Sequence, residues 1–492
     1  MLRKILAYAG LAIGTSSISL LAAAAYGLIA RPDELFVVEV FAGFGLAYVV
    51  LGFLLSRIRT PNLTIGDGIL LTALIWITVP ALTGLPLSLV LDIPFIDAYY
   101  ESVGGWTTTG LTIMSGEPSS WDGRYVPAVS ELPETVKVWR SVMQWLGGLG
   151  IVIFTIALLA RPGISAAILY VAEARYERLE ASLKRSAILL GTIYTILTLV
   201  SILLLYASGM KFIDAFHFAL TGISTAGFSP YSESIAFYID NNAILASSLI
   251  VSFLGAMSFA DHHNILTLRL SRLKESIELK LQIALVALAI AAAYLLWTRD
   301  PVLREAYTLK QAVYDTLSAF TTVGFQSGPL GDASDAFKLL LIGFSAIGGS
   351  AFSTAGGIKV LRLAVTLKVL AMEARMILAP VGYVPMRKIG KYYVDENLIR
   401  RTMATISVFI LTYAALTGLA LILYSNIYNA ADIAFEVASG IFNIGLSTGI
   451  SSAAAPTGMK LILAGSMLMG RLEVMVFLVA AIHLVASVKK AL

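Results

Sequence analysis

The chain has 492 residues, of which 58% are hydrophobic and only 13% are charged, with a formal net charge of +4. A soluble chain of this length would carry about a quarter charged residues, so the composition indicates a protein that is dissolved in lipid. The absence of cysteine excludes disulfides and thiolate metal sites. The basic balance favours loops at a membrane surface over nucleic-acid binding, because no basic patch is interleaved with aromatic residues.

Ten apolar segments are long enough to cross a bilayer, which takes about 20 helical residues. The first follows Met1 and runs to Ala30, which is longer than the apolar core of a secretory signal, and the second covers about 36–56. The other eight form pairs: 66–91 with 139–160, 186–208 with 243–268, 279–297 with 338–382, and 399–424 with 460–487. We therefore expect two N-terminal spans in residues 1–60 and four repeats over 61–162, 163–272, 273–385 and 386–492.

A short stretch between the two spans of each pair recurs in all four repeats. The first copy, Asp97–Thr112, aligns without gaps with Asp214–Ser229, Gln311–Gln326 and Asp432–Ser447. Each copy ends in three residues and a glycine: Thr107-Thr108-Thr109-Gly110, Ser224-Thr225-Ala226-Gly227, Thr321-Thr322-Val323-Gly324 and Phe442-Asn443-Ile444-Gly445. The stretch is too short to cross a bilayer. A helix that enters partway, turns at the glycine and returns extended fits it better than four external loops do.

Four copies of one unit predict four quarters around an axis. Asp97, Asp214 and Asp432 are placed to cap the short helices, whose negative ends would then favour a cation at the axis. The varied side chains before each glycine suit a site made of backbone carbonyls, which can replace the hydration shell of K+. The predicted filter consists of Thr108, Thr109, Gly110, Thr225, Ala226, Gly227, Thr322, Val323, Gly324, Asn443, Ile444 and Gly445.

From about Gly66 to its end, the chain resembles the Trk/Ktr/HKT superfamily of K+ transporters. Three motifs carry the likeness: Trp139-Arg140-Ser141 with Gln144–Gly150, Ser353–Lys359, and Gly470-Arg471-Leu472-Glu473. The resemblance implies an all-α membrane fold with four span–pore-helix–span repeats around one pore. The two extra N-terminal spans are similar to the Trk branch.

The resemblance also implies a function. K+ would be the transported ion, with no organic cofactor in this chain. The pore subunit would form a homodimer that docks on cytosolic nucleotide-binding subunits of the TrkA kind. Asn443 departs from the other filter strands, in a fourth strand that varies within the family. In plant relatives, serine takes the place of Gly110 in the members that prefer Na+.

The segment Gly343–Gly357 interrupts the last span of the third repeat. Its small residues could simply let helices pack closely, whereas the resemblance implies an intramembrane loop that gates the pore. We expect the gate to include Gly348, Gly349, Gly356, Gly357, Lys359 and Arg471. Arg471 lies near the bilayer midplane and must face protein or water. It is not expected to pair with Glu473, because residues two apart on a helix do not face each other.

Positive charge sets the expected orientation. Basic residues gather on one side: Arg3, Lys4, Arg57, Arg59, Arg175, Arg178, Lys184, Arg185, Arg387 and Lys388. By the positive-inside rule, both termini of a multi-pass protein of the cell membrane are then cytoplasmic. These loops suit contact with anionic membrane lipid or with a partner.

The sequence leaves two other classes of protein as alternatives. A secondary transporter with broken midplane helices, moving another solute coupled to Na+ or H+, is the alternative function. Repeats that all run in the same direction disfavour it. A membrane-embedded hydrolase lacks a coherent set of catalytic groups, so the chain is not expected to be an enzyme.

Overall fold

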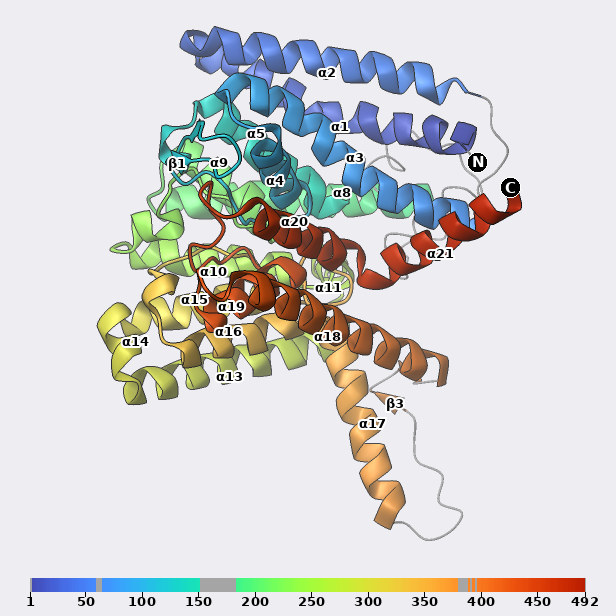
Figure 1. Ribbon diagram of the computed structural model, residues 1–492. Coiled ribbons are helices and arrows are strands. Elements are labelled where there is room, and N and C mark those ends of the chain that lie inside the picture. Colours follow the sequence, from blue (N-terminus) through green and yellow to red (C-terminus); the bar gives the residue numbers. More distant parts are fainter. Residues whose placement is uncertain are drawn as a thin grey trace.

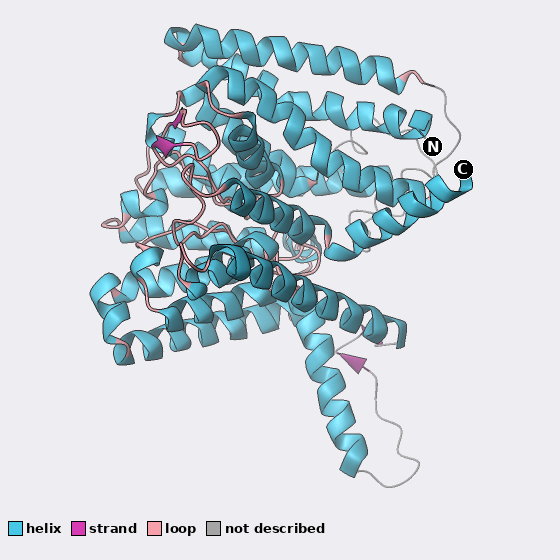
Figure 2. Ribbon diagram, viewed as in Figure 1, coloured by secondary structure: helices cyan, strands magenta, loops and turns pink. Residues whose placement is uncertain are grey.

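The computed structural model describes residues 2–58, 64–150, 183–378, 388–389, 392–393 and 396–491. These residues form helices almost throughout (Figure 2), which confirms the predicted all-α class. The strands are two antiparallel pairs of two residues each. β1 (Glu117–Pro118) pairs with β2 (Tyr125–Val126), and β3 (Lys388–Ile389) pairs with β4 (Tyr392–Tyr393).

Six long apolar helices in the described part of the chain are able to cross a membrane by their length and composition. Two of them, α1 (Leu2–Ala30) and α2 (Leu35–Ser56), form the N-terminal pair, joined by the 3-10 turn η1 (Pro32–Glu34). The other four begin the repeats, and we call them the leading helices: α3 (Ile65–Leu91), α8 (Leu183–Ala207), α13 (Ile277–Arg299) and α18 (Glu396–Tyr424). Both predicted N-terminal spans and all four predicted leading spans are therefore present.

The helices that end the repeats, here called trailing helices, are short: α5 (Glu134–Leu149), α10 (Asn242–Ala256), α16 (Asp335–Ile347) and α20 (Thr457–Leu472). The chain bends by 105° between α10 and α11 (Phe259–Leu266), and by 97° between α20 and α21 (Val474–Ala491). A loop over residues 348–359 separates α16 from α17 (Val360–Leu378). The segments predicted as spans at 243–268 and 460–487 are thus bent pairs of helices, and the bends were not predicted from the sequence. Residues 151–160 of the first one lie outside the described residues.

The position of the third break differs slightly from the prediction. Helix α16 continues through Gly343 to Ile347 and ends only where Gly348 takes a φ of +69°. A left-handed residue cannot continue a right-handed helix, so the chain leaves the helix at Gly348 rather than at Gly343. The broken segment nevertheless contains the predicted gate glycines.

A short helix lies between the leading and trailing helix of each repeat. These are α4 (Phe95–Trp106), α9 (Phe212–Ile223), α15 (Leu309–Thr321) and α19 (Ala430–Ile441). The N- and C-terminal labels lie at one end of the molecule, whereas β1 and α14 (Pro301–Ala306) lie at the opposite end (Figure 1). The remaining elements are short: α12 (Leu270–Leu273) and the 3-10 turns η2 (Val129–Glu131), η3 (Ser234–Tyr238) and η4 (Leu330–Asp332).

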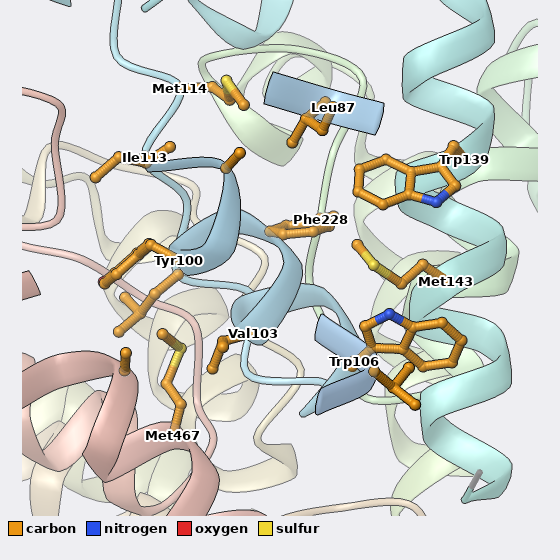
Figure 3. Packing of buried hydrophobic residues seen from close by; sticks show 14 of the residues in the cluster. Leu87, Tyr100, Val103, Trp106, Ile113, Met114, Trp139, Met143, Phe228 and Met467 are labelled. Atoms are coloured by element: carbon orange, nitrogen blue, oxygen red, sulfur yellow. The ribbon is translucent and has the colours of Figure 1, made fainter. Parts of the chain in front are cut away.

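The first short helix is held in a dense apolar core. Trp106 at its end and Trp139 on α5 lie on either side of Met143 (Figure 3). A side chain at Gly105 would overlap the end of Met143, so the glycine lets α4 and α5 approach closely. Trp106 also donates from Nε1 to Thr83 Oγ1 at 2.9 Å, which fixes the indole against α3.

Candidate pore and gate

The four repeated strands meet in a closed ring. Their glycines have left-handed φ values of +85°, +78°, +81° and +93°. A Cβ on each glycine would lie 2.1–2.3 Å from a carbonyl oxygen of the next repeat: Gly110 from Ala226, Gly227 from Val323, Gly324 from Ile444, and Gly445 from Thr109. Because the fourth contact returns to the first repeat, the strands surround one axis. Glycine is required at all four positions, both for its φ and for this close approach.

The residue two before each glycine is also left-handed, with φ of 50–55° at Thr108, Thr225, Thr322 and Asn443. Branched residues such as threonine rarely adopt this conformation, and strain of this kind persists only where the surroundings impose it. In each repeat the next amide donates back to a carbonyl at the end of the short helix, at 2.9–3.1 Å. The strands are therefore held in a conformation that free chains avoid.

Asn443 suits its position better than threonine does, because asparagine tolerates the left-handed region. Its Nδ2 donates to Thr109 Oγ1 at 2.5 Å and to the Met467 carbonyl at 3.1 Å. The side chain thus joins the fourth strand to the first strand and to α20. The departure of Asn443 from the other three repeats has a structural explanation.

The predicted caps of the short helices were wrong. The N-cap positions are Pro94, Lys211, Thr308 and Asn429, and the three aspartates lie one turn further on. Asp97 instead bonds Ser119 Oγ at 2.5 Å, and Asp214 accepts from Tyr231 and Tyr238 at 2.9 and 2.5 Å. These carboxylates hold the loops that follow the ring.

Two of these aspartates also form ion pairs across repeat boundaries. Lys460 Nζ on α20 lies 2.6 Å from Asp97 Oδ1 of the first repeat, and both side chains are at most 1% exposed. Lys338 Nζ on α16 lies 2.6 Å from Asp432 Oδ1 of the fourth repeat. The pairs therefore join repeat 3 to repeat 4 and repeat 4 to repeat 1.

Three fully buried carboxylates, which the sequence analysis missed, support the strands from behind. Glu101, Asp315 and Glu436 each stand nine residues before a ring glycine. Each accepts the backbone N–H three residues after that glycine, from Ile113 at 2.9 Å, Ser327 at 2.7 Å and Thr448 at 3.1 Å. The spacing itself was visible in the sequence, because the same gap-free alignment places two glutamates and one aspartate at this position.

The second repeat has Phe218 at that position, and support comes from α5 of the first repeat. Gln144 donates from Nε2 to the Ala226 carbonyl at 2.8 Å, and its Oε1 accepts from Phe228 N at 3.0 Å. Arg140 donates to Glu101 at 2.7 Å and to the Ser229 carbonyl at 3.0 Å. The motif that carried the family resemblance thus joins two repeats.

The loop 348–359 lies against the inner ends of the ring strands. Thr354 Oγ1 donates to the carbonyls of Ile223 and Gly255, at 3.0 and 2.9 Å. Gly356 N donates to Thr322 Oγ1 at 2.7 Å, and Gly357 N donates to the Phe442 carbonyl at 3.1 Å. The loop therefore contacts repeats 2, 3 and 4 next to the ring strands.

Arg471, at the end of α20, completes the contact with the first repeat. Its guanidinium donates to Thr108 Oγ1 and to the Thr354 carbonyl at 3.1 Å, and to the carbonyls of Gly147 and Gly148 at 2.6 and 3.1 Å. Glu473 pairs instead with Arg362 at 2.6 Å. Both expectations for Arg471 are confirmed, because it faces protein and does not pair with Glu473.

The remaining predicted gate residues lie in the same loop. A Cβ on Gly348 would overlap the Gly356 carbonyl, and a Cβ on Gly349 would lie 2.8 Å from the Ala256 carbonyl. Lys359 donates to the Ala355 carbonyl. A cavity of about 560 Å³ adjoins the loop and reaches both Asn443 and Arg471. Of the basic residues predicted to face lipid or a partner, Arg59, Arg175, Arg178 and Arg387 lie outside the described residues.

These features define a class: multi-pass membrane proteins in which four like units enclose one central site. Comparison with known proteins then gives the family. A family profile described as TrkH, cation transport protein, matches residues 40–298 and 300–490, so the chain belongs to the TrkH family. The resemblance noted in the sequence is confirmed.

Individual relatives agree with this assignment. An uncharacterized cation transporter of Methanocaldococcus jannaschii is 31% identical over 88% of this chain and 86% of its own length. The Trk system potassium uptake protein TrkH of Halomonas elongata is 29% identical over 86% of each chain. The crystal structure of the potassium transporter TrkH from Vibrio parahaemolyticus has the same fold, with a TM-score of 0.80, 24% identity, and coverage of 97% of this chain and 98% of the other.

Proposed function

We propose that this protein takes up K+ across the cell membrane through the ring of four strands, which acts as a selectivity filter. The closed set of contacts between each ring glycine and a carbonyl oxygen of the next repeat carries the proposal. The four oxygens belong to Thr109, Ala226, Val323 and Ile444. Because these side chains differ, the feature that all four repeats share is the backbone carbonyl. Carbonyl dipoles from four strands are suited to replace the hydration shell of a monovalent cation.

The relatives support K+ as the ion. Relatives from Halomonas elongata and Escherichia coli bear the name Trk system potassium uptake protein TrkH, and they cover 86% and 84% of this chain. In this proposal both termini are cytoplasmic and the filter lies in the outer half of the membrane, which the distribution of basic residues supports.

The loop 348–359 and Arg471 form the gate in this proposal. Arg471 places a positive charge at the inner end of the filter, where it repels a cation and holds the loop through the Thr354 carbonyl. The loop contacts therefore represent a closed state. Opening requires Arg471 and residues 354–357 to leave the strand ends together.

Regulation comes from outside this chain in this proposal. The pore subunit forms a homodimer on a cytosolic ring of nucleotide-binding subunits of the TrkA kind, and its basic loops also contact anionic lipid. Co-purification from native membranes tests the partner. Flux that does not respond to nucleotide in such membranes, with no such subunit bound, refutes this regulation.

Ion flux tests the transport function. The purified protein in liposomes is expected to carry K+ and Rb+ faster than Na+ and Li+, and to restore growth at low K+ to cells without K+ uptake systems. Flux that fails to distinguish these ions, or no flux of any of them, refutes a K+ filter. Flux of another solute driven by Na+ or H+ would then favour the secondary-transporter alternative.

A further inference from the structure

The second filter strand is supported differently from the other three. The pore-helix carboxylates of repeats 1, 3 and 4 reach the amide three residues after the glycine and leave the residues next to the glycine untouched. In repeat 2 the support is the amide of Gln144, which reaches both neighbours of Gly227. A neutral amide from another repeat therefore replaces a carboxylate from the same repeat.

The orientation of the Gln144 amide is fixed by its partners. The Ala226 carbonyl can only accept a hydrogen bond and Phe228 N–H can only donate one, so Nε2 must face Ala226 and Oε1 must face Phe228. Gln144 is fully buried, so no bulk water competes for either bond. The Ala226 carbonyl is thus held at 2.8 Å from an N–H donor.

This bond makes the ring of oxygens unequal. Within the described part of the chain, the carbonyl oxygen of Ala226 accepts a hydrogen bond, whereas those of Thr109, Val323 and Ile444 accept none. A carbonyl that accepts an N–H donor has less of its negative field left for an ion. A weaker field disfavours Na+ more than K+, because the smaller ion approaches closer and gains more from a strong dipole.

We propose that Gln144 determines ion selectivity by fixing the Ala226 carbonyl and weakening its field. This inference rests on the proposed K+ filter and names a specificity-determining residue for it. Gln144 acts through the carbonyl and does not itself contact the ion. A purely structural role would predict lower stability or flux without a change in ion preference.

The variant Gln144→Leu tests the proposal, because it removes both the donor and the acceptor at similar volume. The K+/Na+ flux ratio in liposomes is expected to fall about tenfold, which corresponds to the loss of one hydrogen bond of ordinary strength. Gln282→Leu is the matched control. Gln282 on α13 is equally buried and donates to the Ala256 carbonyl at 2.8 Å, which is not one of the four ring oxygens. Its variant should keep the wild-type ratio.

A second measurement keeps the test informative if Gln144→Leu carries little flux. Ions that bind the folded protein raise its thermal unfolding temperature, so stabilisation by K+ can be compared with stabilisation by Na+ in detergent. The preference for K+ should shrink in Gln144→Leu and persist in Gln282→Leu.

The outcomes distinguish a failure of the proposed K+ filter from a failure of the role of Gln144. A wild-type protein that does not discriminate between K+ and Na+ refutes the proposed function itself. A selective wild type with an unchanged ratio in Gln144→Leu overturns the role of Gln144 and leaves the K+ filter standing. An equal fall in both variants also overturns it, because the effect would then follow from any lost amide in the membrane.

Discussion

The substitution Gly110→Ser probes the ring most directly. A Cβ at Gly110 would lie 2.1 Å from the Ala226 oxygen, whereas real contacts of this kind stay beyond 3.0 Å, so the two strands must separate by about 0.9 Å. The φ of +85° adds about 1–2 kcal/mol of strain for any residue with a Cβ. Gln144 holds the Ala226 carbonyl at 2.8 Å and hinders its retreat.

We therefore expect Gly110→Ser to displace one oxygen of the ring and to admit Na+. A change of about 1.4 kcal/mol in relative binding corresponds to a tenfold change, so the K+/Na+ flux ratio should fall by about that factor. Tracer flux in liposomes measures it. Gly123→Ser is the matched control, because Gly123 has a φ of +78° but open space around it and lies outside the ring. An unchanged ratio in Gly110→Ser would refute a backbone-carbonyl filter.

Three further predictions concern the gate and the ion pairs. Arg471→Ala should raise K+ flux roughly tenfold with little change in the K+/Na+ flux ratio, because the guanidinium loses its bonds to Thr108 and Thr354. Flux that does not rise, together with misfolding of the variant, would show that the charge is structural. Arg362→Ala is the control. Deleting Gly348 and Gly349 should also raise flux in the same assay, and a loss of selectivity instead would place this loop in the filter. Lys460→Met should lower the free energy of unfolding by about 3–5 kcal/mol, because it leaves Asp97 buried and unpaired. Adding Asp97→Asn should recover part of that loss in thermal unfolding, and two additive losses would show that the pair does not couple.

The repeated strands could be predicted from the sequence because they obey local rules. A helix too short for the membrane, followed by glycine in register four times, leaves few alternatives in lipid. The bends at the ends of α10 and α20 were missed because their apolar runs continue through the break. Hydropathy indicates burial in lipid but not the direction in which a helix runs. At the second bend the left-handed residue is Glu473, so no glycine in the sequence marks the break.

The partners of the charged residues were the least predictable part. Asp97 was placed correctly near the start of a helix, and the sequence favoured the nearest use for it, a cap. Its actual partner, Lys460, lies 363 residues away along the chain. Gln144 appeared only within a family motif, because nothing local to α5 indicates that it would bond a strand of another repeat. Contacts between repeats depend on how the four units close, which local patterns do not encode.

The Lys460–Asp97 pair has a consequence for how the protein is made. Asp97 is synthesised 363 residues before Lys460. Burying the carboxylate before its cation is present would be costly. The nascent chain must therefore keep Asp97 hydrated or shielded while the middle repeats are made. The ion pair that fixes the first repeat therefore forms only after the fourth repeat has been made. A chain truncated before Lys460 should remain a substrate for membrane quality control.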